Sequence, residues 1–140
     1  SDEFHVFHPG GKLGARLLRV EQLMHGPAML PLVRDDTPMS EAVVEISARG
    51  FGIVGVIDLT GQLHGVISDG DLRRNIDRLL ERHAGQVCTQ QPVTVTPDTL
   101  AAEALAIMNA HKISALFALD SKENPVGILH IHDCLRAGIA

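Results

Sequence analysis

The chain has 140 residues, enough for one ordinary domain or for two very small ones that share a core. Its net charge of −5 argues against broad attraction to nucleic acid or to an anionic membrane. Aromatic residues make up only 3% of the chain, so stacking platforms for single-stranded nucleic acid are scarce. The hydrophobic fraction of 45% can fill a core, but no apolar run approaches the roughly 20 residues that span a bilayer.

The two cysteines and the start of the chain indicate its cellular setting. Cys88 and Cys134 match no CxxC spacing of a zinc or redox site, which indicates free thiols in a reducing compartment, and we expect a cytoplasmic protein. No signal-peptide pattern opens the chain. The segment from His8 to Gly14 is a loop broken by proline and glycine, with nothing upstream to support it. We therefore expect a chain whose upstream part is missing.

The first predicted helix lies over Lys12–His25 and ends at Gly26-Pro27. Its evidence is the helical spacing of four apolar residues, Leu13, Leu17, Val20 and Met24. We expect this helix to act as a connector that packs either on the two repeats or on a missing upstream domain.

A small α/β unit follows. Thr37-Pro38 predicts a helix start, because threonine caps free N–H groups and proline suits the first helical position. Ile53–Ile57 is nearly all apolar, which is typical of a strand buried on both faces, and Leu63–Ile67 is its predicted partner. A helix is then predicted from Asp69 to about His83. Its expected inward-facing residues are Leu72, Ile76, Leu79 and Leu80.

The same pattern returns in the second half of the chain without a gap. Four pairs of residues are each 62 positions apart: Ala42 and Ala104, Asp58 and Asp120, Gly65 and Gly127, Asp71 and Asp133. The second copy ends in a helix predicted over Ile131–Ile139. A unit of this size cannot bury both sides of its strands alone. We therefore predict a mixed α/β (α+β) fold in which two pseudo-symmetric copies share a core and leave a ligand cleft between them.

These passages resemble tandem cystathionine-β-synthase (CBS) domains, which sense ligands. The resemblance covers about Leu23–Ala140 and depends on the helix-to-strand passage Ala48–Asp58 and on Gly65–Leu72. In the second copy it depends on His111–Asp120 and on Gly127–His130. It implies two β-α-β-β-α repeats packed as a pair, preceded by a linker helix.

A narrower resemblance is to the C-terminal region of the bacterial arabinose-5-phosphate isomerase family. It depends on His8–Gly14, Leu23–His25, Ser68–Arg74 and His130–Gly138. That family joins a sugar isomerase (SIS) domain to a CBS pair and interconverts arabinose 5-phosphate and ribulose 5-phosphate for the Kdo sugar of lipopolysaccharide or capsule. The resemblance implies that the SIS domain is absent here and that this fragment is not itself an enzyme, although its parent is an aldose–ketose isomerase.

Ser68 and Asp71 are the leading candidates for ligand binding, at the end of a strand and the start of a helix. A hydroxyl there, together with free N–H groups, can bind phosphate, and a carboxylate can accept two hydrogen bonds from a ribose diol. CBS pairs use this Ser/Thr-x-x-Asp pattern to contact nucleotides. The same spacing also fits a helix capping box with no ligand. Ile53 completes the candidate set in this copy.

The second copy departs from that pattern, because His130 stands where a serine or threonine would bind phosphate, while Asp133 is kept. His130 could approach a phosphate as a cation, or the cleft could take a sugar acid or sugar nucleotide. His130 and His132 would point opposite ways on a continuing strand, which is a poor chelate, so we expect no metal site. Arg73 and Arg74 fit either an anionic ligand or a solvated helix face.

His8 is the only candidate catalytic residue, and only in a full-length enzyme, since its loop would border the SIS active site. The expected division is residues 1–25 as SIS remnant and linker, 26–83 as repeat 1 and 84–140 as repeat 2. The expected function is regulatory sensing of an adenine or cytidine nucleotide or sugar nucleotide, with no required cofactor. The alternative is an oligomerisation module without a small ligand. Expected partners are the SIS domain of the same chain and a second copy, joined through the CBS helices.

Overall fold

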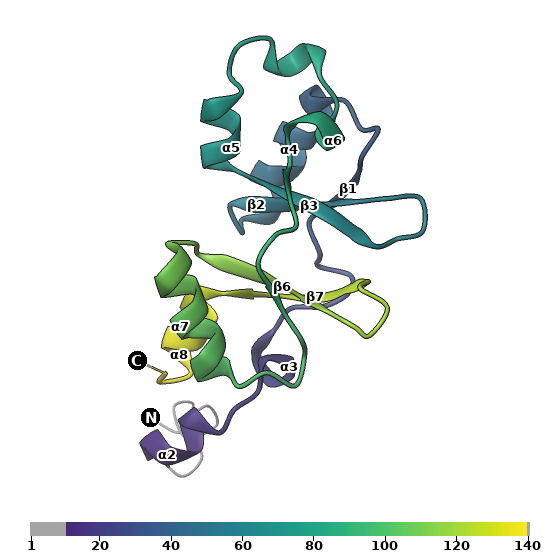
Figure 1. Ribbon diagram of the computed structural model, residues 1–140. Coiled ribbons are helices and arrows are strands. Elements are labelled where there is room, and N and C mark those ends of the chain that lie inside the picture. Colours follow the sequence, from purple (N-terminus) through teal and green to yellow (C-terminus); the bar gives the residue numbers. More distant parts are fainter. Residues whose placement is uncertain (1–10, 140) are drawn as a thin grey trace.

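Two β-sheets stacked face to face form the centre of the molecule (Figure 1). This computed structural model describes residues 11–139. The first repeat consists of β1 (Leu32–Arg34), α4 (Met39–Arg49), β2 (Ile53–Ile57), β3 (Leu63–Ser68) and α5 (Asp69–Arg74). The second consists of β5 (Thr94–Val95), α7 (Ala101–His111), β6 (Ala115–Leu119), β7 (Pro125–His130) and α8 (Ile131–Arg136). The mixed α/β fold with two repeats is thereby confirmed.

The 62-residue register predicted from the sequence holds for every main element. Helix α4, strands β2 and β3 and helix α5 recur as α7, β6, β7 and α8 with the same lengths. In each copy the first strand pairs parallel with the second, which pairs antiparallel with the third. Even the irregularity between Val56 and Ile57 recurs between Ala118 and Leu119. The two copies therefore share backbone details as well as a sequence pattern.

Each repeat buries its own core, and a third core joins the two. Its buried residues are Leu30, Phe51, Ala115, Phe117 and Ile128. Both repeats contribute to this set, so the inner faces of the two sheets pack on each other. A sheet with helices on one face only must cover its other face, and here the second copy provides the cover. The predicted shared core is confirmed.

Two short segments outside the repeats, residues 20–25 and 84–90, cross from one copy to the other, and we call them the crossing segments. Helix α6 (Ala84–Val87) and strand β4 (Thr89–Gln90) precede the second repeat but pack on the first, where β4 pairs with β3. Helix α3 (Val20–Leu23) precedes the first repeat but packs in the core of the second. His25 then pairs with Ile128 of β7. Each copy is completed by the segment that leads into the other.

The predicted linker helix over Lys12–His25 is wrong. The chain forms two short helices there, α2 (Gly11–Arg16) and α3, separated at Arg19. Leu13 and Leu17, expected on one buried face with Val20, are exposed. The N–H of Val20 instead donates to the carbonyl of Thr99 in the second repeat, at 2.8 Å. This pairing with a distant loop interrupts the helix that the apolar spacing predicted.

The helix predicted from Asp69 to about His83 is also wrong. Helix α5 ends at Arg74, and a 3₁₀ turn, η1 (Leu79–Glu81), and α6 follow. Of the expected inward residues, Leu79 is buried, but Ile76 and Leu80 are 71% and 65% exposed. Asn75 leaves the helical conformation, with φ −114° and ψ 22°, and its side chain donates to the carbonyl of Asp71.

The last helix is shorter than predicted as well, since α8 ends at Arg136 rather than at Ile139. Gly138 adopts a positive φ of 85°, a conformation in which the helix cannot continue. Among residues 11–139, no helix is long and apolar enough to cross a membrane.

Candidate functional site

Two adjoining cavities lie along the seam between the repeats. The larger has a volume of about 690 Å³ and the smaller about 240 Å³, and both are lined by Ile53, Ser68 and Arg74 of the first repeat and by His111 and Ile113 of the second. The predicted cleft between the repeats is therefore present. The smaller cavity also has the apolar side chains Val66, Val93, Ala115 and Phe117 on its wall.

Asp71 lies at the edge of the smaller cavity and is only 4% exposed. Its Oδ2 accepts hydrogen bonds from the backbone N–H of Ser68 at 2.9 Å and from the Ser68 hydroxyl at 3.1 Å. Its Oδ1 accepts from Arg74 at 2.7 Å and from the Thr89 hydroxyl at 2.6 Å. Asp71 therefore caps α5 and also fastens the crossing segment at Thr89 to the first repeat.

These hydrogen bonds determine the charge of Asp71. Burial alone would raise the pKa of this carboxyl, but hydrogen bonds from Thr89, Ser68 and Arg74 outweigh it and hold the pKa below the usual 3.8. The group is thus a carboxylate at neutral pH. A carboxylate only accepts hydrogen bonds, which is the role that a ribose diol needs in a partner.

The second repeat builds the same arrangement around Asp133, which is 6% exposed. Oδ2 accepts from the backbone N–H of His130 at 2.8 Å. Oδ1 pairs with Arg136 and, at 2.9 Å, with Nε2 of His25. Arg136 is the counterpart of Arg74, and His25 is the counterpart of Thr89 in the other crossing segment. Ser68 and His130 are likewise equivalent.

His130 differs from Ser68 in chemistry as well as in size. Burial and the neighbouring His132 lower the pKa of His130 more than Asp133 raises it. Its Nδ1 accepts a hydrogen bond from the backbone N–H of His132 at 3.1 Å, so that nitrogen carries no proton. This favours a neutral ring over the cation considered from the sequence. The two rings do not point apart as a continuing strand would require, since their centroids are 4.7 Å apart at the start of α8.

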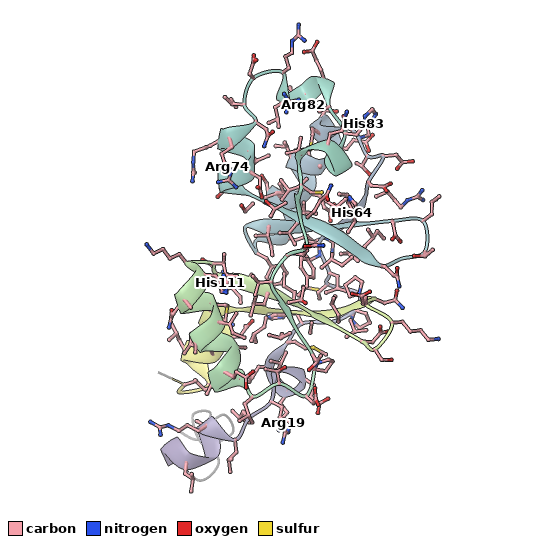
Figure 2. The ribbon with its side chains drawn as sticks, in the orientation of Figure 1. Arg19, His64, Arg74, Arg82, His83 and His111 are labelled. Atoms are coloured by element: carbon pink, nitrogen blue, oxygen red, sulfur yellow. The ribbon has the colours of Figure 1, made fainter. Side chains whose placement is uncertain are left out.

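Basic side chains gather at the mouth of the larger cavity. Arg73 and Arg74 belong to α5. Lys112 directly follows α7 and adopts a left-handed φ of 56°. Figure 2 shows Arg74 and His111 on the same side of the molecule, one on each repeat. Among the described residues of this lining, Asp69 is the only acidic one. An apolar recess that opens onto a basic mouth suits a ligand with a flat apolar group and a phosphate.

The predicted site residues fall into two groups. Ser68, Asp71 and Ile53 line the smaller cavity together, and His130 lines the larger one. Asp133 belongs to the separate cluster around His25. His8 lies outside the described residues. Within residues 11–139, no group of three or more histidine, cysteine or acidic side chains is arranged to hold a metal ion.

Sequence reasoning missed Thr89 and His25, because neither lies 62 residues from a recognised site residue. The two crossing segments are related by a different offset, of 64. One signal was present: Gln22 and Gln86 share that offset, and each accepts a hydrogen bond from the backbone N–H three residues earlier. Aligning these two glutamines would have placed His25 opposite Thr89.

The profile of the CBS domain family matches residues 20–78 and 84–140. The chain belongs to the CBS domain family. The structure agrees, because the two matched segments contain the two copies described above and form a CBS pair.

The relatives confirm the narrower resemblance too. Arabinose 5-phosphate isomerase KdsD of Pseudomonas aeruginosa is 44% identical over 143 residues, which cover 99% of this chain but 44% of the relative. The chain thus spans less than half the length of this relative.

Two solved structures support the fold. CBSX2 in complex with AMP is 24% identical, with a TM-score of 0.76 over 86% of this chain and 96% of the other. The CBS domain pair of protein MJ0100, in complex with 5′-methylthioadenosine and S-adenosyl-L-methionine, is 18% identical, with a TM-score of 0.75 over 86% of this chain and 94% of the other.

Proposed function

We propose that this CBS pair senses a nucleotide or sugar nucleotide in the seam beside Ser68 and Asp71, and so regulates an arabinose 5-phosphate isomerase of which it is part. The supporting observation is the pair of adjoining cavities that both repeats line, the smaller with apolar walls and the larger with Arg73, Arg74 and Lys112 at its mouth. The AMP complex of the similar CBSX2 supports an adenine nucleotide as one candidate ligand. The 44% identity to KdsD supports the isomerase as the regulated enzyme. On this proposal the cellular location is the cytoplasm, and the pathway is Kdo synthesis.

The proposed binding mode follows from the contacts in the smaller cavity. The base lies between Ile53 and Ile113, which come from opposite repeats. Arg74, whose side chain is 68% exposed, turns from Asp71 toward the phosphate. This movement frees Oδ1 of Asp71 for a ribose hydroxyl, while the Ser68 hydroxyl and the first turn of α5 meet the phosphate.

Regulation follows from the position of the ligand between the repeats. A ligand that touches both repeats favours the arrangement in which its contacts are best, and it shifts the equilibrium only by its difference in affinity for the two arrangements. The segment Arg19–His25 is anchored on the second repeat through Thr99 and Ile128. As part of the proposed linker, residues 1–25, it would carry the shift to the isomerase domain.

Isothermal titration of the chain with AMP, ATP, CMP and CMP-Kdo tests the proposal. We expect at least one of these nucleotides to bind, and Arg73→Ala and Lys112→Ala each to weaken that binding about 5–10-fold through loss of a charge at the phosphate. Arg78→Ala removes an exposed arginine that lies outside both cavities and is the matched control. Silence with all four compounds would refute nucleotide sensing.

A second candidate function is assembly of isomerase subunits. It is supported by Ile76 and Leu80, which project into solvent from the turn after α5, and by the exposed Leu135 on α8. Sedimentation of the full-length enzyme against a version without this CBS pair separates the two functions. A smaller oligomer after removal supports assembly, whereas an unchanged oligomer that no longer responds to nucleotide supports sensing.

A further inference from the structure

We propose that His25, packed on Phe51, closes the site that the second repeat forms around Asp133 for the same class of ligand. This inference rests on the proposed nucleotide binding at Ser68 and Asp71. It predicts that each chain binds one ligand although it has two related sites.

The first step is the equivalence of the two sites. Asp71 and Asp133 occupy the same position in α5 and α8, and each is held by the backbone N–H three residues earlier and by the arginine three residues later. Both are almost fully buried. The carboxylate that would hold a ribose is therefore already in place in the second repeat.

The second step is that the crossing segments reach these carboxylates in the same way. The N–H of Ala84 donates to Thr37 at 2.8 Å, and the N–H of Val20 donates to Thr99, also at 2.8 Å. Thr89 then meets the Oδ1 atom of Asp71, and His25 meets the Oδ1 atom of Asp133. One position in each segment thus decides what stands beside the carboxylate.

The third step is the difference in size at that position. The first site has the small hydroxyl of Thr89 there, and Ile113 on the facing repeat. In the second site the corresponding residues are His25 and Phe51, whose ring centroids are 5.3 Å apart. Phe51 is buried in the core between the sheets. Two rings in contact therefore occupy the positions that Thr89 and Ile113 hold in the first site.

His25 also satisfies Asp133 in the way that a ligand would. Its Nε2 lies 2.9 Å from Oδ1, so the buried carboxylate has a partner without any bound molecule. A ribose hydroxyl would have to displace both this contact and the packing on Phe51. A threonine at position 25 would still supply a hydroxyl to Asp133, as Thr89 does to Asp71, but would leave the ring volume empty.

The test exchanges the residues between the sites and counts bound ligands. Wild type, His25→Thr, the double variant H25T/F51I, the reciprocal Thr89→His and the control His64→Thr are titrated calorimetrically with AMP, ATP, CMP and CMP-Kdo. Circular dichroism and thermal unfolding verify that each variant is folded. We expect about one equivalent per chain for wild type and His64→Thr, and two equivalents for the double variant. Thr89→His is expected to lose affinity at least 10-fold.

The outcomes separate this inference from the proposed function. Two equivalents in wild type, or one equivalent in both opened variants, would overturn the closure by His25 but leave nucleotide sensing intact. Silence of wild type and of all variants would overturn both. Should the opened variants not fold, Thr89→His decides alone: undiminished affinity there refutes the idea that a ring at this position closes a site.

Discussion

The two repeats have nearly the same backbone but differ in the side chains around one buried carboxylate. Asp71 is surrounded by small hydroxyl groups, those of Ser68 and Thr89, and lies beside a cavity. Asp133 is bonded instead to the imidazole ring of His25 and to the backbone N–H of His130. Both repeats therefore keep the buried carboxylate that caps the helix and holds the crossing segment. The partners beside the carboxylate differ between the repeats, which teaches that its structural role does not depend on which side chain the crossing segment supplies.

The largest expected effect tests the structural role in both repeats. Asp71→Ala leaves four hydrogen-bond donors without their partner and is expected to lower the free energy of unfolding by about 3 kcal/mol. Asp133→Ala removes the hydrogen-bond partner of three groups and is expected to lower the free energy of unfolding somewhat less. Urea unfolding measures both, with the exposed Asp77→Ala as control. Equal, small losses for all three variants would contradict the structural role.

The next largest effect is expected at Gly65 and Gly127, the two glycines at which a crossing segment packs against a strand. A Cβ atom at Gly65 would come within 2.6 Å of the backbone carbonyl of Thr89. At Gly127 it would collide with the side chain of Met24, which can move aside. We expect Gly65→Ala to destabilise by about 2 kcal/mol and Gly127→Ala by about 1 kcal/mol. The reverse order in urea unfolding would show that the second repeat holds its crossing segment more rigidly.

A smaller effect concerns pH. Folding lowers the pKa of Asp71, so its charge contributes stability that is complete above its ordinary pKa of 3.8 and is lost as the pH falls through the lower folded value. The stability difference between wild type and Asp71→Asn is therefore expected to be constant near neutrality and to shrink below about pH 4. Urea midpoints measured from pH 7 to pH 2 show this. A difference that grows on acidification has the wrong sign and would refute it.

The smallest effect compares the two thiols. Burial and Asp133 raise the pKa of Cys134 to about 11, and this residue is fully buried. Burial and Asp71 also raise the pKa of Cys88, which is only half-buried. At pH 8 we expect iodoacetamide to modify Cys88 slowly and Cys134 only after unfolding. Peptide mass spectrometry reports the order, and faster modification of Cys134 would contradict the packing of α8.

The duplicated fold could be predicted because its evidence is local and periodic. Ala42 with Ala104 and Gly65 with Gly127 mark the same points in two copies, and the observed elements recur at this spacing. The site at Ser68 and Asp71 followed from the junction between a strand and a helix. The first prediction needed only a pattern that recurs at one fixed spacing, and the second needed only residues that are neighbours along the chain.

The parts that could not be predicted depend mostly on contacts between distant segments. Apolar spacing predicted one helix through Leu17 and Val20, but the N–H of Val20 bonds to Thr99 far along the chain. The helix after Asp69 ends early at Asn75, whose side chain bonds back to Asp71, a local contact that the apolar spacing does not register. The role of His25 depends on its contact with Asp133, 108 residues away, which no local pattern reveals.

The exchange of α3 and α6 between the copies bears on how such a chain could originate. A protein with a single copy would leave the inner face of its sheet uncovered, because that face packs on the other copy. The short helix before each repeat also packs on the other one. Two identical molecules could cover each other by trading these arms, and fusion of their genes would then turn a partnership between molecules into one within a chain. Once both halves were inherited together, position 25 could acquire a histidine while position 89 remained a threonine, which no symmetric ancestor could have done.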